Sequence, residues 1–165
     1  MTEENIAYFD NAATTFPKPD EVYSFMDSFY RNCGINIGRS GSTLSQSAAS
    51  LQNQTRELIL ELFHCKGKTV IFEPSATIAL NQVIRGLDWK DGDTVYITPF
   101  EHNAIARPLF GKCQEHGIDI QMIPFDPQTH ELDMEELGRL FAINPPDYVF
   151  LNQVSNVTGT IVPIG

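Results

Sequence analysis

The sequence has few cysteines, little positive charge and no long hydrophobic run. Among its 165 residues, 3 are cysteine, 11 are lysine or arginine and 21 are aspartate or glutamate, which gives a formal net charge of −10. A field of this sign repels nucleic acids, and no basic cluster offsets it. No segment approaches the roughly 20 consecutive apolar residues that a transmembrane helix needs. We therefore expect neither a nucleic-acid partner nor a membrane partner.

The cysteines are scattered, and none forms a C-x-x-C pair: Cys33, Cys65 and Cys113. An odd number without such spacing predicts free thiols, each a small buried hydrophobic residue. The first five residues are acidic and polar, unlike a secretory signal, which begins with basic and then apolar residues. These observations predict a cytoplasmic protein.

From residue 69 onward, short apolar runs alternate with helical patterns. We expect strands at 69–72, 94–97, 118–123 and 148–151, and helices at about 75–87, 102–116 and 133–141. Gly117 is placed to end the second of these helices, and Asp133 with Glu136 has the spacing of a capping box at the start of the third. The alternation predicts an α/β fold with a mostly parallel sheet and flanking helices.

The first part of the chain has a different pattern. A strand-like segment at 6–9 precedes a helical pattern from residue 19, a glycine-containing loop at 32–42 and a long amphipathic helix at 44–63, with Gly67 placed to end it. No repeat or linker interrupts the chain. We therefore expect a single domain, with an N-terminal arm at about 1–43 and an α/β portion at about 44–165.

In parallel sheets, ligands bind beyond the carboxyl ends of the strands, which directs attention to residues 73–77, 98–103 and 152–160. The first segment places Ser75 and Thr77 at the start of a helix, where free N–H groups and hydroxyls suit a phosphate. The same residues would also serve as ordinary helix caps. The Gly-Lys-Ser/Thr sequence of a nucleotide-binding P-loop is missing, so a nucleoside triphosphate is not implied.

The other two segments offer a histidine and a run of polar residues. His102 follows a buried strand and could stack on a planar ligand or move a proton, although a lone histidine is more often a cap or a surface residue. No second histidine or cysteine has zinc-ligand spacing. Residues 152–160 could donate hydrogen bonds to a ligand or simply form a turn closed by Gly159.

Five motifs follow one another over nearly the whole chain, at residues 8–15, 36–41, 75–81, 101–104 and 154–159. Together they resemble the class V aminotransferase family and, within it, the cysteine desulfurases. The resemblance implies the N-terminal portion of a fold type I large domain and pyridoxal 5'-phosphate (PLP) as the cofactor. It implies conversion of L-cysteine to L-alanine with transfer of sulfur to the enzyme.

The resemblance also implies roles for particular residues. The backbone of Ala76 and the side chain of Thr77 would hold the cofactor phosphate. His102 would stack on the pyridine ring and take part in catalysis, and Asn156 would hydrogen-bond the phenolic oxygen. The residues near the substrate would be Asn11, Ala12, Ala13 and Arg39.

The family's Schiff-base lysine, pyridine-nitrogen acid and sulfur-carrying cysteine would lie beyond residue 165, so the domain is expected to be incomplete and inactive as given. Implied partners are an amino-acid substrate, a second copy in a homodimer and a sulfur-acceptor protein. A selenocysteine lyase or another class V aminotransferase is an alternative, as is a non-catalytic ligand-binding or assembly fragment. Ile78, Ser42 and Gln153 replace residues common in relatives, which leaves the substrate preference open.

Overall fold

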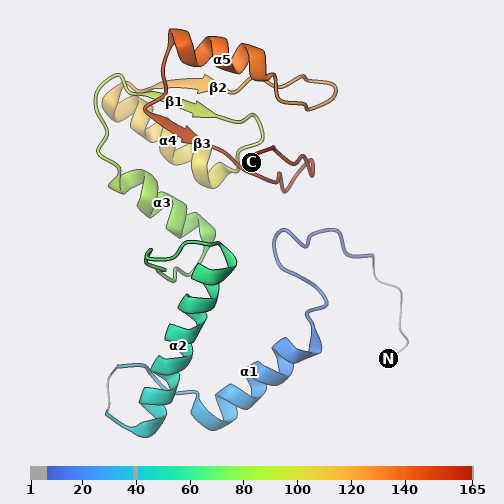
Figure 1. The fold of residues 1–165 in the computed structure, drawn as a ribbon, viewed down its shortest axis with the longest axis vertical. Coiled ribbons are helices and arrows are strands. Elements are labelled where there is room, and N and C mark those ends of the chain that lie inside the picture. Colours follow the sequence, from blue (N-terminus) through green and yellow to red (C-terminus); the bar gives the residue numbers. More distant parts are fainter. Residues whose placement is uncertain (1–6, 39–40, 165) are drawn as a thin grey trace. The chain divides into compact units, whose positions relative to one another are not determined.

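A computed structural model describes residues 7–38 and 41–164. The chain divides into two compact units, Met1–Phe72 and Glu73–Gly165 (Figure 1). No helix in the described ranges is both long enough and apolar enough to cross a membrane. The expected single domain, with its arm and its α/β portion, stays a prediction.

The first unit contains two helices, α1 (Asp20–Cys33) and α2 (Thr43–Leu62). Two acidic residues occupy the first turn of α1, where negative charge is favourable. The Ser42 hydroxyl caps α2 by accepting a hydrogen bond from the N–H of Ser45 at 3.2 Å. Within these helices only Ser45 and Ala48 are buried, so local interactions dominate this unit.

The second unit is built around a three-stranded parallel sheet. Its strands are β1 (Thr94–Ile97), β2 (Asp119–Met122) and β3 (Tyr148–Phe150), in the order β2-β1-β3. Its helices are α3 (Ala76–Gly86), α4 (Asn103–His116) and α5 (Met134–Ile143). Because β1 lies between the other two strands, all of its residues are buried.

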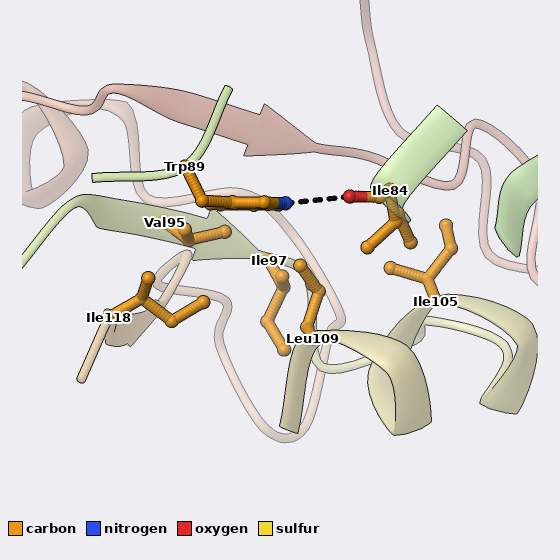
Figure 2. Close-up of a cluster of buried hydrophobic side chains, with 7 residues drawn as sticks. All are labelled: Ile84, Trp89, Val95, Ile97, Ile105, Leu109 and Ile118. Carbon is orange, nitrogen blue, oxygen red and sulfur yellow. Dashed lines mark hydrogen bonds between the residues drawn. The ribbon is translucent and has the colours of Figure 1, made fainter. Parts of the chain in front are cut away.

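Helices pack against both faces of this sheet. On one face, side chains of β1 meet α3 and α4 in a cluster shown in Figure 2, formed by Ile84, Trp89, Val95, Ile97, Ile105, Leu109 and Ile118. On the other face the ring of Tyr96 contacts Phe141 of α5, with ring centroids 4.7 Å apart. This alternation along β1 confirms the predicted α/β fold with flanking helices.

Two predicted helix boundaries are confirmed by their hydrogen bonds. Gly117 adopts a left-handed conformation with φ 60° and ends α4 by donating its N–H to the carbonyl of Cys113. The Asp133 side chain accepts a hydrogen bond from the N–H of Glu136 at 2.9 Å and begins α5. Both ends follow from local chemistry, which explains why the sequence predicted them.

The prediction of strands at 69–72 and in the described part of 6–9 is wrong. A strand needs a neighbour to complete its backbone hydrogen bonds, and neither segment pairs with one among the described residues. The carbonyl of Val70 instead accepts a hydrogen bond from Nε of Arg56 at 3.3 Å. The Arg56 guanidinium also lies over the ring of Phe72.

The end of α2 also differs from the prediction. The helix ends at Leu62, before Gly67, because His64 adopts the left-handed conformation with φ 53°. The N–H of His64 bonds the carbonyl of Glu61, and the N–H of Cys65 bonds that of Leu60. This pair of bonds is a Schellman motif, in which histidine occupies a position that glycine usually takes.

All three cysteines are free, as predicted. Cys33 and Cys113 are half-buried, and Cys113 packs against the core. Cys65 is exposed, so the prediction that it is a buried hydrophobic residue is wrong. Cys65 is the last residue of the Schellman motif, where the chain leaves the helix.

Candidate functional site

The start of α3 presents unpaired backbone donors. Ser75 caps the helix, with its hydroxyl accepting from the N–H of Ile78 at 3.3 Å. The N–H groups of Ala76 and Thr77 lie in the first turn and have no acceptor among the described residues. Thr77 is exposed. The cap and an anion site are therefore compatible, because Ser75 occupies only the N–H of Ile78 and leaves those of Ala76 and Thr77 for an anion.

His102 connects the end of β1 to α4 and caps that helix. Its ring Nδ1 accepts a hydrogen bond from the N–H of Ala104 at 3.0 Å. A nitrogen that accepts this bond carries no proton, so the neutral ring has its proton on Nε2. The capping interpretation is confirmed, and it leaves the Nε2 edge of an exposed ring available to a ligand.

Asn156 lies in a turn that Ser155 organises. The Ser155 hydroxyl is acceptor for the N–H groups of Val157 and Thr158, at 3.3 and 3.2 Å. Gly159, at φ 73°, donates its N–H to the carbonyl of Ser155. The segment is thus a turn closed by Gly159, and burial of Ser155 leaves the neighbouring Asn156 exposed.

Two adjoining cavities bring these residues together within the second unit. The larger, of about 880 Å³, is lined by Thr77 and His102 among others, and the smaller, of about 320 Å³, by His102 and Asn156 among others. His102 and Asn103 line both cavities. Residues from the start of α3 and from the carboxyl ends of β1 and β3 therefore border one continuous region, as expected for a parallel sheet.

The larger cavity gathers positive charge in an acidic chain. Arg85, Arg107 and Lys112 line it. The Nζ of Lys112 donates to the carboxylate of Glu115 at 2.7 Å, and this hydrogen bond together with the charge of Lys112 lowers the pKa of Glu115. The two arginines make no ion pair among the described residues, so their charge is available to an anionic ligand.

The remaining predicted site residues belong to the first unit. Asn11, Ala12 and Ala13 form an exposed turn, in which the N–H of Ala13 donates to the carbonyl of Asp10 at 3.1 Å. The Asn11 side chain accepts from the N–H of Phe16 at 3.2 Å. Arg39 lies outside the described residues. Proximity of these four residues to the substrate stays a prediction.

The sequence reasoning missed the cationic residues and Glu101. Arg85 could have been found by spacing, because Thr77, Asn81 and Arg85 recur every four residues and share one face of α3. Glu101 lies in the motif at 101–104, but the sequence reasoning assigned it no role, because its contact with Asn152 spans 51 residues. In the described part of the chain, no group of histidine, cysteine, aspartate and glutamate could hold a metal ion.

Comparison with known proteins defines the class. The model of the aminotransferase class-V family matches residues 7–165, and the chain belongs to this family. A probable cysteine desulfurase of Pyrococcus abyssi is 29% identical over 164 residues, covering 98% of this chain and 39% of the relative. The chain thus spans about two fifths of the length of such curated relatives.

Solved structures share the fold. The apo structure of a cysteine desulfurase from Thermococcus onnurineus NA1 has a TM-score of 0.86 and 28% identity, covering 97% of this chain and 40% of that one. The more distant C-DES, 22% identical with a TM-score of 0.64 over 88% of this chain and 36% of its own, shares the fold. In that structure glycine is covalently linked to the PLP cofactor.

Proposed function

We propose that this chain supplies the phosphate- and ring-binding part of the PLP site in a cysteine desulfurase. The observation that carries the proposal is the meeting of Thr77, His102 and Asn156 along two adjoining cavities. Membership of the class-V aminotransferase family and the named relatives support the same reaction class.

The donor set fits a phosphorylated, planar and aromatic cofactor. The free N–H groups of Ala76 and Thr77 and the Thr77 hydroxyl would hold the phosphate. The charges of Arg85 and Arg107 favour an anion in the same cavity. PLP, when bound, supplies an electron sink for bond cleavage in an amino-acid substrate.

His102 and Asn156 would orient the cofactor ring. The cap bond to Ala104 holds the imidazole in one orientation, with Nδ1 occupied and the proton on Nε2. The face of the ring would cover the pyridine, and Nε2 would be the atom that gives or takes a proton. The Asn156 side-chain amide, exposed at the tip of its turn, would donate to the phenolic oxygen.

In the proposed reaction, L-cysteine and an enzyme thiol yield L-alanine and an enzyme persulfide, so that one C–S bond breaks and one S–S bond forms. The proposal keeps Asn11, Ala12, Ala13 and Arg39 near the substrate, and residues 44–165 as the cofactor-binding portion of an incomplete domain. It includes a cytoplasmic homodimer that passes sulfur to an acceptor protein.

Ligand binding by the purified natural protein tests this proposal. We expect PLP to bind more tightly than pyridoxal, because only PLP carries the phosphate. Thr77→Val removes the hydroxyl and should weaken PLP binding by about tenfold, as expected for loss of a charge-assisted hydrogen bond, without affecting pyridoxal. Equilibrium dialysis measures both affinities.

Thr69→Val is the matched control, since Thr69 is exposed and outside the cavities. It should leave both affinities unchanged. Alanine formation from L-cysteine by the natural protein tests the reaction itself. Equal binding of PLP and pyridoxal, or no alanine from a PLP-loaded protein that includes the expected Schiff-base lysine, would contradict the proposed function.

A further inference from the structure

The side chain of Glu101 joins the segments that follow two neighbouring strands. One of its oxygens, Oε1, accepts a hydrogen bond from the Thr98 hydroxyl at 2.6 Å and another from the backbone N–H of Asn152 at 2.7 Å. Thr98 follows β1 and is 1% exposed, whereas Asn152 lies just beyond β3. A single carboxylate oxygen therefore spans the two segments.

This link continues the connection between β1 and β3 beyond their ladder. The last backbone pair of the two strands is Ile97 with Phe150, after which each chain turns into its own loop. A second bond runs beside the first, from Nδ2 of Asn152 to the carbonyl of Phe100 at 3.4 Å. The two bonds to Glu101, at 2.6 and 2.7 Å, are shorter than this second bond, so they dominate the link.

The link lies directly beside both ring-binding residues. His102 is the next residue after Glu101, and Asn156 is in the turn that begins after Asn152. Glu101, His102 and Asn156 line the same smaller cavity. Loss of the two bonds to Glu101 would loosen the connection between the loop that carries His102 and the segment that carries Asn156.

The second carboxylate oxygen makes the inference testable. Oε2 of Glu101 is buried and has no hydrogen-bond partner among the described residues. Glutamine would keep an oxygen at the Oε1 position and place its NH₂ where Oε2 lies, so it would break none of the observed bonds. Alanine would remove both bonds. The two substitutions therefore separate the acceptor from the charge.

We propose that Glu101 is a positioning residue. Through its Oε1 it fixes the segment that carries His102 relative to the segment that carries Asn156. The inference rests on the proposed function in one respect, which is that His102 and Asn156 bind the cofactor ring. The contact itself is independent of any ligand. Glu101 acts through its neighbours and is not assigned a role in proton transfer.

Hydrogen exchange and NMR of the purified natural protein test the contact without a ligand. In Glu101→Ala, the Asn152 amide should exchange about tenfold faster or more, as expected for loss of a short hydrogen bond, and the ¹⁵N signals of the His102 ring should shift. Glu101→Gln should stay within about threefold of wild type, because it retains the acceptor. Glu131→Ala is the control, because Glu131 is an exposed loop residue whose carboxylate makes no hydrogen bond within the described ranges, and it should change neither signal.

PLP affinity is the second readout. Glu101→Ala should bind PLP about tenfold more weakly, and Glu101→Gln should restore binding to near the wild-type value. The proposal is overturned if Glu101→Gln is as damaging as Glu101→Ala, if Glu101→Ala leaves Asn152 exchange unchanged, or if PLP affinity falls without any change in the Asn152 and His102 signals. If wild type binds no PLP, the proposed function fails, and the exchange and ring signals still decide the role of Glu101.

Discussion

The two units differ in how their apolar residues are used. In the second unit, Ile84, Val95 and Leu109 are each 0% exposed and form part of one core. In the first unit, Tyr30 of α1 is 69% exposed and Leu58 of α2 is 65% exposed. Both units contain helices, so the presence of helices does not distinguish them.

The difference shows that an amphipathic helix can form without its apolar face becoming part of a buried core. A cap such as Ser42 and acidic residues in a first turn suffice to begin a helix. Burial requires a second apolar surface, and β1 supplies it to α3 and α4. The stability of the second unit should therefore depend on distant contacts, and that of the first on local ones.

The largest expected effect comes from removing a core side chain. Leu109→Ala should lower the free energy of unfolding by about 2–5 kcal/mol because it leaves a cavity, whereas Leu58→Ala should change it by less than about 0.5 kcal/mol. Urea unfolding followed by fluorescence of Trp89, the only tryptophan, reports on the second unit. A circular-dichroism signal in the same experiment reports on all helices. Equal losses in the two variants would remove the distinction between the units.

A smaller effect is expected from removing a tyrosine hydroxyl that donates to two carbonyls. The Tyr96 hydroxyl bonds the carbonyls of Leu140 and Asn144 at 3.3 and 2.9 Å, across more than 40 residues of sequence. Tyr96→Phe should lower the free energy of unfolding by about 0.5–1.5 kcal/mol, because it leaves two partly buried carbonyls with fewer partners.

Tyr8→Phe is the matched variant in the first unit. The Tyr8 hydroxyl also donates to two carbonyls, both within six residues and both exposed. Water can replace the lost donor there, so a change of only a few tenths of a kcal/mol is expected. If thermal unfolding shows that Tyr8→Phe costs as much as Tyr96→Phe, burial is not what separates the two units.

The smallest expected effect is the loss of stability of one loop at low pH. The backbone N–H groups of Thr129 and then Gln128 donate to the Asp126 carboxylate and lower its pKa. A group whose pKa is lower in the folded state stabilises the fold above its unfolded pKa, near 3.9, and loses this contribution as the pH falls through the folded value. The loop at 124–132 should therefore loosen below about pH 4.

Asp126→Asn isolates this contribution. Its side-chain oxygen can still accept from both N–H groups, but it does not titrate in this range. Exchange of the Gln128 and Thr129 amides should depend less on pH in the variant than in wild type. Identical pH dependence in the two proteins would show that Asp126 does not govern the loop.

Sequence patterns predicted the elements whose ends and faces are set within a few residues. Strand β1 at 94–97 coincides with the prediction, and Gly117 and Asp133 mark helix ends where expected. One failure occurred where a contact over a longer distance was needed, and another was a local helix end at an unexpected residue. Residues 69–72 have the composition of a strand but make no ladder among the described residues, and His64 ended α2 before Gly67 could do so.

The candidate site divides in the same way. The segments that contain Thr77, His102 and Asn156 were predicted because each follows an apolar strand, and the parallel sheet brings such positions to one edge. The roles of the three residues came from the family resemblance. The interpretations as cap and as ligand-binding residue were left open for His102. The structure shows that the cap uses Nδ1 alone.

The sequence by itself determined the alternation of strands and helices, the position of most helix ends and the family to which the chain belongs, because these depend on residue type and short spacing. Only the tertiary structure decided which apolar faces are buried, how the cations gather in one cavity, and that Glu101 connects the segments after β1 and β3. Such contacts join residues up to about 50 positions apart. They arise only when the sheet has brought its strand ends together, and no local pattern encodes them.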